Sequence, residues 1–178
     1  MLRQAKIWQA ARATSAASSF FDPIEIAGEE FVDGATPANN PIYEIWTEAY
    51  DAFRDPENPE WNLEDNLLCL VSIGTGIPTL KPFGKDPLHI AGAMVAIATD
   101  TEKRAQDFHK HHTKLYKERR YFRFNVLRGL ENVGIEDAEK KKEIISATRL
   151  YLQTEDIFTQ MEACAEALNE RECSSQFA

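Results

Sequence analysis

The chain has 178 residues, of which 43% are hydrophobic, and this is enough for one domain with a buried core. Its formal net charge of -9 argues against nucleic acid as the main partner, because phosphate binding needs a basic face. The charges are unevenly spread. Residues 22–65 hold 13 acidic residues and one basic residue, whereas residues 103–128 hold 9 basic and 2 acidic residues. We interpret the basic segment as a solvated face of mixed charge; the alternative is a face that orients the molecule against an anionic surface.

Cysteine usage and the lack of long apolar runs indicate the compartment. Cys69, Cys164 and Cys173 are far apart and form no CxxC pair, which predicts free thiols in a reducing environment. The N-terminal segment carries charges within a helical pattern, so we expect no signal peptide, and no apolar run approaches the ~20 residues that cross a bilayer. We therefore expect a cytoplasmic protein or one bound peripherally to a membrane.

The first predicted elements are a helix, a short strand and a second helix. Small and apolar residues at helical spacing predict a helix over roughly 3–16. Residues 31–33 are expected to form a short strand, which Gly34 ends. Asn40 followed by Pro41 predicts a helix start, because asparagine is a good N-cap and proline fits the first turn. The apolar face of this helix comprises Ile42, Ile45, Trp46, Ala49 and Phe53.

The remaining elements alternate between strands and helices. Residues 55–66 are polar and broken by prolines, so they predict a loop, and the apolar run LLCLVSI at 67–73 predicts a strand buried on both faces. A helical pattern covers 88–117. The segment YFRFNV alternates and predicts a strand, with Tyr121, Arg123 and Asn125 on one face and Phe122, Phe124 and Val126 on the other. Residues 136–171 predict two helices with Thr154 as the N-cap between them, which makes the fold class α/β.

Several functional motifs are present only in part. The segment GTGIPTLKPFGKD lacks the glycine at Thr79 that both nucleotide-binding patterns require. His109 and His112 have helical metal-pair spacing but no matching second set of ligands, so we interpret them as solvated. No serine lies in a GxSxG pattern; Ser72 comes closest. Cys69 lies within the predicted buried strand, which favours an inert thiol.

Three successive segments carry a further pattern: WQAARATSAASSFFDPIEI at 8–26, FVDGATPANNP at 31–41 and LVSIGTG at 70–76. Their order and spacing resemble those of patatin-like phospholipases. In that family an arginine-bearing helix with the sequence ARA followed by serine or threonine precedes a DGG or DGA aspartate, and NNP and then SIGTG or SLGTG follow. The resemblance covers about residues 8–126, and YFRFNV is similar to a strand of fungal members.

The resemblance implies an intracellular lipid acyl hydrolase with a partial three-layer α/β/α fold, a mostly parallel sheet and a helical C-terminal tail. It makes residues 1–135 the C-terminal part of the phospholipase domain, and residues 136–178 a helical tail or the start of a linker to further modules. The implied substrate is an acyl ester of a phospholipid or neutral lipid, met at a membrane surface, and no metal or other cofactor is needed.

By the same resemblance, Asp33 is the base of a Ser–Asp dyad and forms the DGA motif with Gly34 and Ala35. Such a base must lie on a rigid element within hydrogen-bond reach of the serine hydroxyl. The alternative is a purely structural aspartate, since Asp-Gly often stabilises turns. The residues expected to support the site are Arg12, Asn39, Asn40, Ser72, Gly74, Thr75 and Gly76.

Two of these supporting elements have their own interpretation. Arg12 lies in a helix of small residues and can equally well pair with a carboxylate. Residues 72–76 should form a loop at the carboxyl end of a strand, where ligands of α/β proteins usually bind. We expect this loop to support the site and to take no part in the chemistry.

The chain also departs from the family pattern. Ser18 stands where proline is common, and we expect this to affect a turn alone. The glycine-rich oxyanion loop and the GxSxG serine of the family lie upstream of the matching segments, and the 178 residues contain neither. The sequence therefore leaves two hypotheses: the C-terminal part of a lipid acyl hydrolase, or a truncated, non-catalytic protein of the family with a binding or regulatory role.

Overall fold

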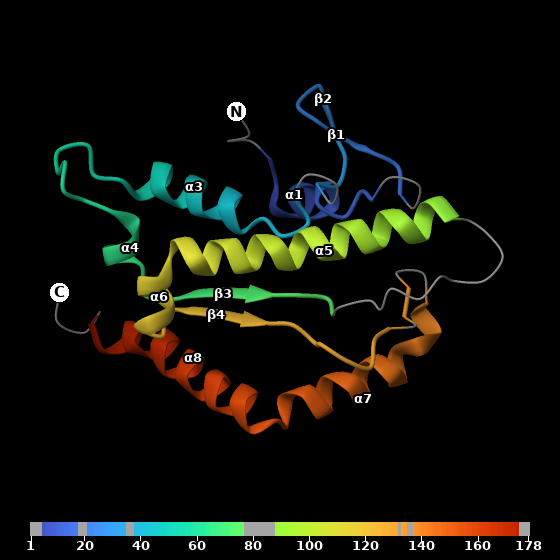
Figure 1. Ribbon diagram of the computed structural model, residues 1–178. Coiled ribbons are helices and arrows are strands. Elements are labelled where there is room, and N and C mark those ends of the chain that lie inside the picture. Colours follow the sequence, from blue (N-terminus) through green and yellow to red (C-terminus); the bar gives the residue numbers. More distant parts are fainter. Residues whose placement is uncertain are drawn as a thin grey trace. The chain divides into compact units, whose positions relative to one another are not determined.

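A computed structural model describes residues 5–17, 21–34, 38–76, 88–131, 133–134 and 137–174, with 88–99 and 170–174 described by their backbone alone (Figure 1). The chain divides into two compact units, Met1–Pro41 and Ile42–Ala178. Ala35 of the expected DGA motif lies outside the described residues.

The first unit contains a short helix and a hairpin. Helix α1 (Ile7–Ala13) is shorter than predicted, because Thr14 and Ser15 donate side-chain hydrogen bonds to the Ala11 carbonyl at 3.0 and 2.8 Å where the helix ends. Strands β1 (Ile24–Ile26) and β2 (Glu29–Phe31) pair antiparallel.

The hairpin turn corrects the predicted strand at 31–33. Ala27 and Gly28 both have positive φ, of 54° and 83°, as a two-residue turn with the twist of the flanking strands requires. This turn places Ile24 opposite Phe31 and makes Phe31 the last strand residue. Asp33 therefore lies beyond the strand.

The second unit places helices on both faces of a parallel pair of strands. Strand β3 (Leu70–Ile73) pairs with β4 (Tyr121–Phe124), with Leu70 opposite Tyr121 and Ile73 opposite Phe124. Figure 1 shows α5 on one face of this pair and α7 and α8 on the other, which confirms the α/β expectation. The described helices of the unit are α3 (Ile42–Phe53), α4 (Leu63–Asn66), α5 (Leu88–His111), α6 (Thr113–Lys117), the 3-10 helix η1 (Ala138–Lys140), α7 (Lys141–Leu152) and α8 (Glu155–Ser174).

An aromatic cluster forms the core between α3, α5 and β4. Phe108 is fully buried, and its ring centroid lies 5.4 Å from that of Tyr43, 5.5 Å from that of Trp46 and 5.2 Å from that of Tyr121. Tilted and edge-on contacts at these distances are favourable beyond the area that they bury. Of the predicted apolar face of α3, Ile42 and Trp46 pack in this core, together with Tyr43, which was not assigned to that face. Ile45 and Phe53 were wrongly included, because they are 52% and 71% exposed.

Strand β3 is not covered on both faces, contrary to the prediction from LLCLVSI. Val71 and Ile73 are 37% and 77% exposed, whereas Ser72, on the opposite face, is buried. The strand covered on both faces is β4: Tyr121 contacts Phe108 of α5, and Phe122, on the opposite face, is also buried. An apolar run cannot tell whether a second layer of helices reaches that strand or its neighbour.

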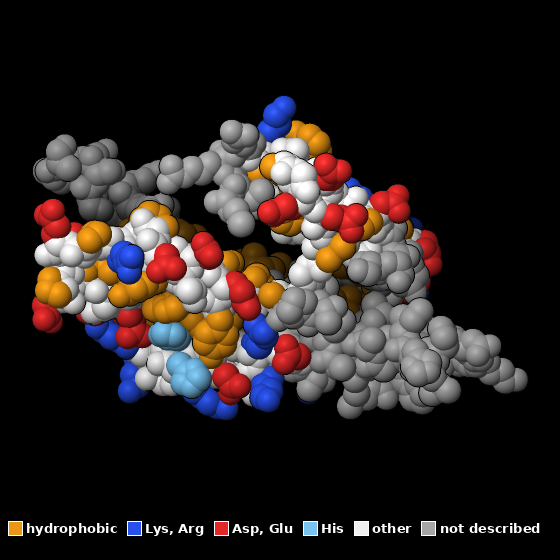
Figure 2. Space-filling view, turned by 90° about the horizontal axis from the view of Figure 1, so that it is seen from above, with side chains coloured by type: hydrophobic (Ala, Val, Ile, Leu, Met, Phe, Trp, Pro, Cys, Tyr) orange, Lys and Arg blue, Asp and Glu red, His pale blue; other side chains and the backbone are white. Residues whose placement is uncertain are grey.

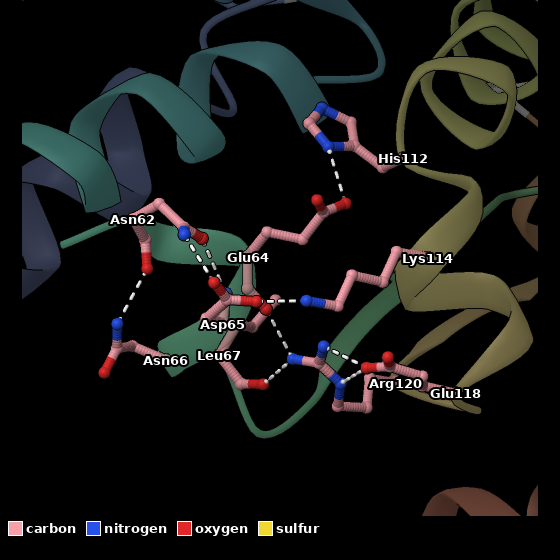
Figure 3. Close-up of polar contacts among 9 residues, drawn as sticks. All are labelled: Asn62, Glu64, Asp65, Asn66, Leu67, His112, Lys114, Glu118 and Arg120. Atoms are coloured by element: carbon pink, nitrogen blue, oxygen red, sulfur yellow. Dashed lines mark hydrogen bonds and ion pairs between the residues drawn. The ribbon is translucent and has the colours of Figure 1, made fainter. Parts of the chain in front are cut away.

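A polar cluster fixes the beginnings of both strands (Figure 3). Arg120, directly before β4, donates from Nη1 to the main-chain carbonyls of Glu64 and Leu67 at 2.6 and 2.5 Å, and its guanidinium also binds Glu118. The Leu70 N–H donates to the Arg120 carbonyl at 2.7 Å. One arginine thus ties the end of α4 and the start of β3 to the start of β4.

Helix α4 itself was predicted as loop. Asn62 caps it by accepting a hydrogen bond from the Asp65 N–H at 2.8 Å, which is the usual role of asparagine before a first helical turn. Lys114 pairs with Asp65, and His112 lies 3.4 Å from Glu64 (Figure 3). These contacts come from α6 and its N-cap, so the local sequence of α4 did not show them.

The later helix boundaries are mostly as predicted. The helical segment 88–117 is interrupted at His112, where α5 gives way to α6. The tail forms the two expected helices, and Thr154 directly precedes α8. Its hydroxyl donates to the Tyr151 carbonyl at 2.8 Å and so stabilises the end of α7.

The basic segment 103–128 is part of a mixed-charge surface. Acidic and basic side chains lie next to one another on the face that Figure 2 shows. Such neutralised pairs agree with the interpretation as a mixed-charge face. Ion pairs of this segment among the described residues include Arg104–Glu44, Arg104–Asp100, Lys110–Asp107, Lys114–Asp65, Arg120–Glu118 and Arg123–Glu102. Within the described ranges, none of the helices combines the length and apolarity needed to span a bilayer.

Candidate active site

Asp33 follows the hairpin of the first unit and is held there by its main chain. Its N–H donates to the carbonyl of Ala16 at 3.0 Å, and Ala16 is fully buried. The aspartate is half-buried, and the next residue, Gly34, is exposed. A Cβ added at Gly34 would meet no atom within 4 Å, so the space beside this glycine is open.

Arg12 supports the same region through the backbone. Its Nη2 donates to the main-chain carbonyl of Asp22 at 2.6 Å, and the guanidinium carbon lies 5.7 Å from the centre of the Phe21 ring. The Nη1 atom is buried and has no hydrogen-bond partner among the described residues. The arginine therefore joins the end of α1 to the segment that leads into the hairpin.

The NNP segment leads from Asp33 into the helix that follows. Asn40 is buried, Asn39 is exposed, and α3 begins at Ile42, directly after Pro41. The predicted helix start is thus confirmed.

The loop at Ser72–Gly76 belongs to the second unit and follows β3. The Ser72 hydroxyl is buried and accepts a hydrogen bond from Arg123 Nη1 at 3.0 Å. Its neighbour is thus a cationic donor that cannot take a proton. Burial, the largest influence, raises the pKa of the nearby Tyr121 phenol, which keeps it neutral. Neither of these two neighbours can act as a base for Ser72.

The same loop is built around Asn125, which directly follows β4. Asn125 is 6% exposed, and its Oδ1 accepts a hydrogen bond from the Gly76 N–H at 2.7 Å. Its Nδ2 donates to Glu102 Oε1 at 2.7 Å, and Arg123 Nη2 binds the same oxygen at 2.7 Å. The carboxyl ends of the two parallel strands therefore meet in one hydrogen-bonded network.

Steric constraints explain why glycine occupies positions 74 and 76 of this loop. A Cβ at Gly74 would lie 2.4 Å from Asn125 Oδ1 and 2.8 Å from Arg123 Nη2. Gly76 has φ +100°, and a Cβ there would lie 2.6 Å from Leu130 Cδ1. The side chain of Thr75, between them, is exposed.

The histidines and cysteines have separate environments. The His109 ring centroid lies 4.0 Å from that of Tyr116, whereas that of His112 lies 4.3 Å from those of Trp46 and Phe108. Where the chain is described, no three histidine, cysteine or acidic side chains are grouped so that they could hold a metal ion. Burial first, and then the neighbouring Cys164 thiol, raise the pKa of Cys69 to about 11, so the thiol stays protonated and weakly reactive.

Comparison with known proteins supports the resemblance to patatin-like phospholipases. Residues 1–46 match the sequence model of the patatin-like phospholipases. Phospholipase A I of Arabidopsis thaliana is 32% identical to this chain over 122 residues. The chain belongs to the patatin-like phospholipase family. The aligned stretch is 67% of this patatin-like chain but 9% of the Arabidopsis protein, so the chain spans a small part of that relative's length. No solved structure matches it significantly.

The expected site residues of this patatin-like chain fall into two groups. Arg12, Asp33, Gly34, Asn39 and Asn40 lie in the first unit, within the residues that match the family. The loop at 72–76 lies in the second unit, where Ser72, Gly74 and Gly76 contact Arg123 and Asn125.

Sequence reasoning missed two residues that contact Asn125. Glu102 of α5 and Tyr151 of α7 received no role, although Asn125 contacts both. The available signal was YFRFNV itself, where Arg123 and Asn125 are strong hydrogen-bonding groups on one face of a strand that is otherwise aromatic. Polar groups buried in this way need partners, and that pointed to a network.

Proposed function

We propose that this chain is part of a lipid acyl hydrolase that cleaves fatty-acyl esters of phospholipids or neutral lipids. Membership of the patatin-like phospholipase family and the name of the Arabidopsis relative support this proposal. The observation that carries it is the position of Asp33: a half-buried carboxylate, with its main chain fixed to Ala16 and open space beside Gly34.

In the proposed mechanism Asp33 is the base of a Ser–Asp dyad. A serine hydroxyl attacks the ester carbonyl while its proton passes to the Asp33 carboxylate, and the alcohol leaves with a proton. Water then attacks the acyl-enzyme in the same way and releases the fatty acid. The 178 residues contain no GxSxG serine, so in this proposal another segment of the protein supplies the nucleophile.

The short extent of the match to the Arabidopsis protein favours a longer protein with further modules. Because phospholipids reside in membranes, we propose that the protein meets its substrate at a membrane surface, as a peripheral protein. The Ser–Asp mechanism needs no metal or cofactor. Assignment to the fungal members of the family rests on the YFRFNV segment alone.

The test uses the full-length protein and measures fatty-acid release from phosphatidylcholine vesicles and from emulsified triacylglycerol. Asp33→Asn should lower kcat on the order of 100- to 10,000-fold, the usual contribution of a general base, and leave the melting temperature close to that of wild type. Glu30→Gln, which removes an exposed carboxylate from β2, is the matched control and should retain activity.

Two results would contradict the proposal. If Asp33→Asn is as active as Glu30→Gln, then Asp33 is not the base. If the wild-type full-length protein releases no fatty acid from either substrate, the protein is not an acyl hydrolase of this kind. In that case the non-catalytic hypothesis is favoured, and binding to the same vesicles tests it.

A further inference from the structure

We propose that Asn125 and Glu102 are positioning residues that hold the Gly74–Gly76 loop in the shape needed for ester hydrolysis. This inference rests on the proposed function. Neither residue was assigned a role from the sequence: Asn125 lies in the YFRFNV segment and Glu102 in α5. Neither is proposed to take part in bond making.

The Asn125 side-chain amide has a fixed orientation. Its Oδ1 faces the Gly76 N–H, and its Nδ2 faces the Glu102 carboxylate, both at 2.7 Å. A carboxylate can only accept and an N–H can only donate, so this amide has a single orientation that satisfies both partners. Asn125 thereby fixes the backbone of Gly76 from a side chain that is 6% exposed.

Glu102 binds the two side chains that contact the loop. Its Oε1 accepts hydrogen bonds from Asn125 Nδ2 and from Arg123 Nη2, so the half-buried guanidinium and the amide that holds the loop share one acceptor. Arg123 also donates to Ser72, the first residue of the loop region. Glu102 is therefore linked to both ends of the stretch from Ser72 to Gly76, through Arg123 at Ser72 and through Asn125 at Gly76.

The loop backbone has little space in which to adopt another conformation. The space beside Gly74 is filled by Asn125 and Arg123, and the space beside Gly76 by Leu130. A loop packed this closely moves only if these side chains move. It lies at the carboxyl ends of β3 and β4, the edge at which ligands of α/β proteins usually bind.

The consequence is that a small displacement of Asn125 should change catalysis more than it changes substrate affinity. Misplacement by about 1 Å of groups that orient a substrate can cost roughly 100-fold in rate. A residue that supports folding alone would instead change activity only in proportion to the folded fraction.

The test compares variants of the full-length protein in phosphatidylcholine hydrolysis. Asn125→Asp is nearly isosteric but sets a second carboxylate against Glu102, and it should lower kcat on the order of 10- to 100-fold with little change in KM. In the double variant Glu102→Gln with Asn125→Asp, the amide donor is at position 102 and the carboxylate acceptor at position 125. The pair again has one donor and one carboxylate. This double variant should recover most of the lost kcat.

Two further variants separate positioning from folding. Asn125→Ser adds no buried charge and is too short to reach the Gly76 N–H, so it should repeat the loss of kcat if Asn125→Asp does not fold. Tyr151→Phe removes the hydroxyl that accepts a hydrogen bond from the Asn125 N–H at 3.1 Å and leaves the loop contacts in place. It should lower the melting temperature but keep kcat.

Amide hydrogen exchange of Gly76 gives a readout that does not depend on activity. Exchange should be faster in both Asn125 variants and return toward the wild-type rate in the double variant. Unchanged exchange at Gly76, or a kcat in both Asn125 variants equal to that of Tyr151→Phe, would overturn the inference. If the wild-type protein hydrolyses no lipid ester, the proposed function fails and so does the catalytic part of this inference, while the exchange rates still decide whether Asn125 holds the loop.

Discussion

Asn125 occupies the space that a side chain at Gly74 would need. An added Cβ would lie 2.4 Å from its Oδ1 and 2.5 Å from its Cγ, both far inside van der Waals contact. The two residues are 51 positions apart in sequence and meet because β3 and β4 are neighbours in register. The first glycine of the GTG segment is therefore a consequence of the strand pairing.

Gly74→Ala should destabilise the second unit. The added methyl group cannot be accommodated unless Asn125 and Arg123 move away from Glu102, and such overpacking costs about 1–3 kcal/mol. Urea denaturation followed by circular dichroism measures the change. Thr75→Ala, which alters an exposed side chain in the same loop, should shift the free energy of unfolding by less than about 0.5 kcal/mol. Equal stability of the two variants would refute this account of Gly74.

Arg120→Met should lower stability by about 1.5–3 kcal/mol, the range for hydrogen bonds that involve a charged group. The methionine keeps the length of the side chain but leaves the carbonyls of Glu64 and Leu67 without this donor. Arg120→Lys should recover only part of the loss, because an ammonium group does not reproduce the planar fork of the guanidinium. Urea denaturation at neutral pH gives the comparison.

The control for Arg120 is Lys114→Met in the same cluster. The Lys114–Asp65 pair is about half exposed, and exposed ion pairs contribute little because water and salt screen them. Its loss should therefore have a much smaller effect than that of Arg120. The hypothesis that Arg120 ties α4 to β4 is wrong if the two variants lose equal stability.

Alkylation of Cys69 should be slow in the folded protein and should accelerate steeply with pH. Burial and the Cys164 thiol raise its pKa to about 11, and the reactive species is the thiolate. At pH 8 roughly one thiol in 1,000 is then ionised, and the fraction rises tenfold with each pH unit until the pH approaches the pKa. Mass spectrometry of the Cys69 peptide after timed treatment with iodoacetamide measures the rate.

The same reaction in denaturing urea is the reference for Cys69. Unfolding removes both the burial and the Cys164 neighbour, so the pKa returns toward that of an ordinary thiol and the rate at pH 8 should increase strongly. Equal rates in the folded and unfolded protein would show that the thiol is not held in this environment.

The sequence alone determined those elements that depend on residues close by in the chain. The Asn40–Pro41 start of α3, the two tail helices and the alternation of YFRFNV could all be predicted, because caps and hydrophobic periodicity act over a few residues. The boundary of α1 was less well predicted, since hydroxyl groups of Thr14 and Ser15 compete for backbone carbonyls at its end.

The family segments with Asp33 and the SIGTG loop were also visible in the sequence, and they led to the proposed function. Only the tertiary structure showed that β4, and not β3, is covered on both faces, and that Arg120 joins the starts of both strands. It also decided that Asn125 and Glu102 hold the loop at Gly74–Gly76. Those contacts join residues tens of positions apart, and they exist only once strand pairing and helix packing have brought the segments together.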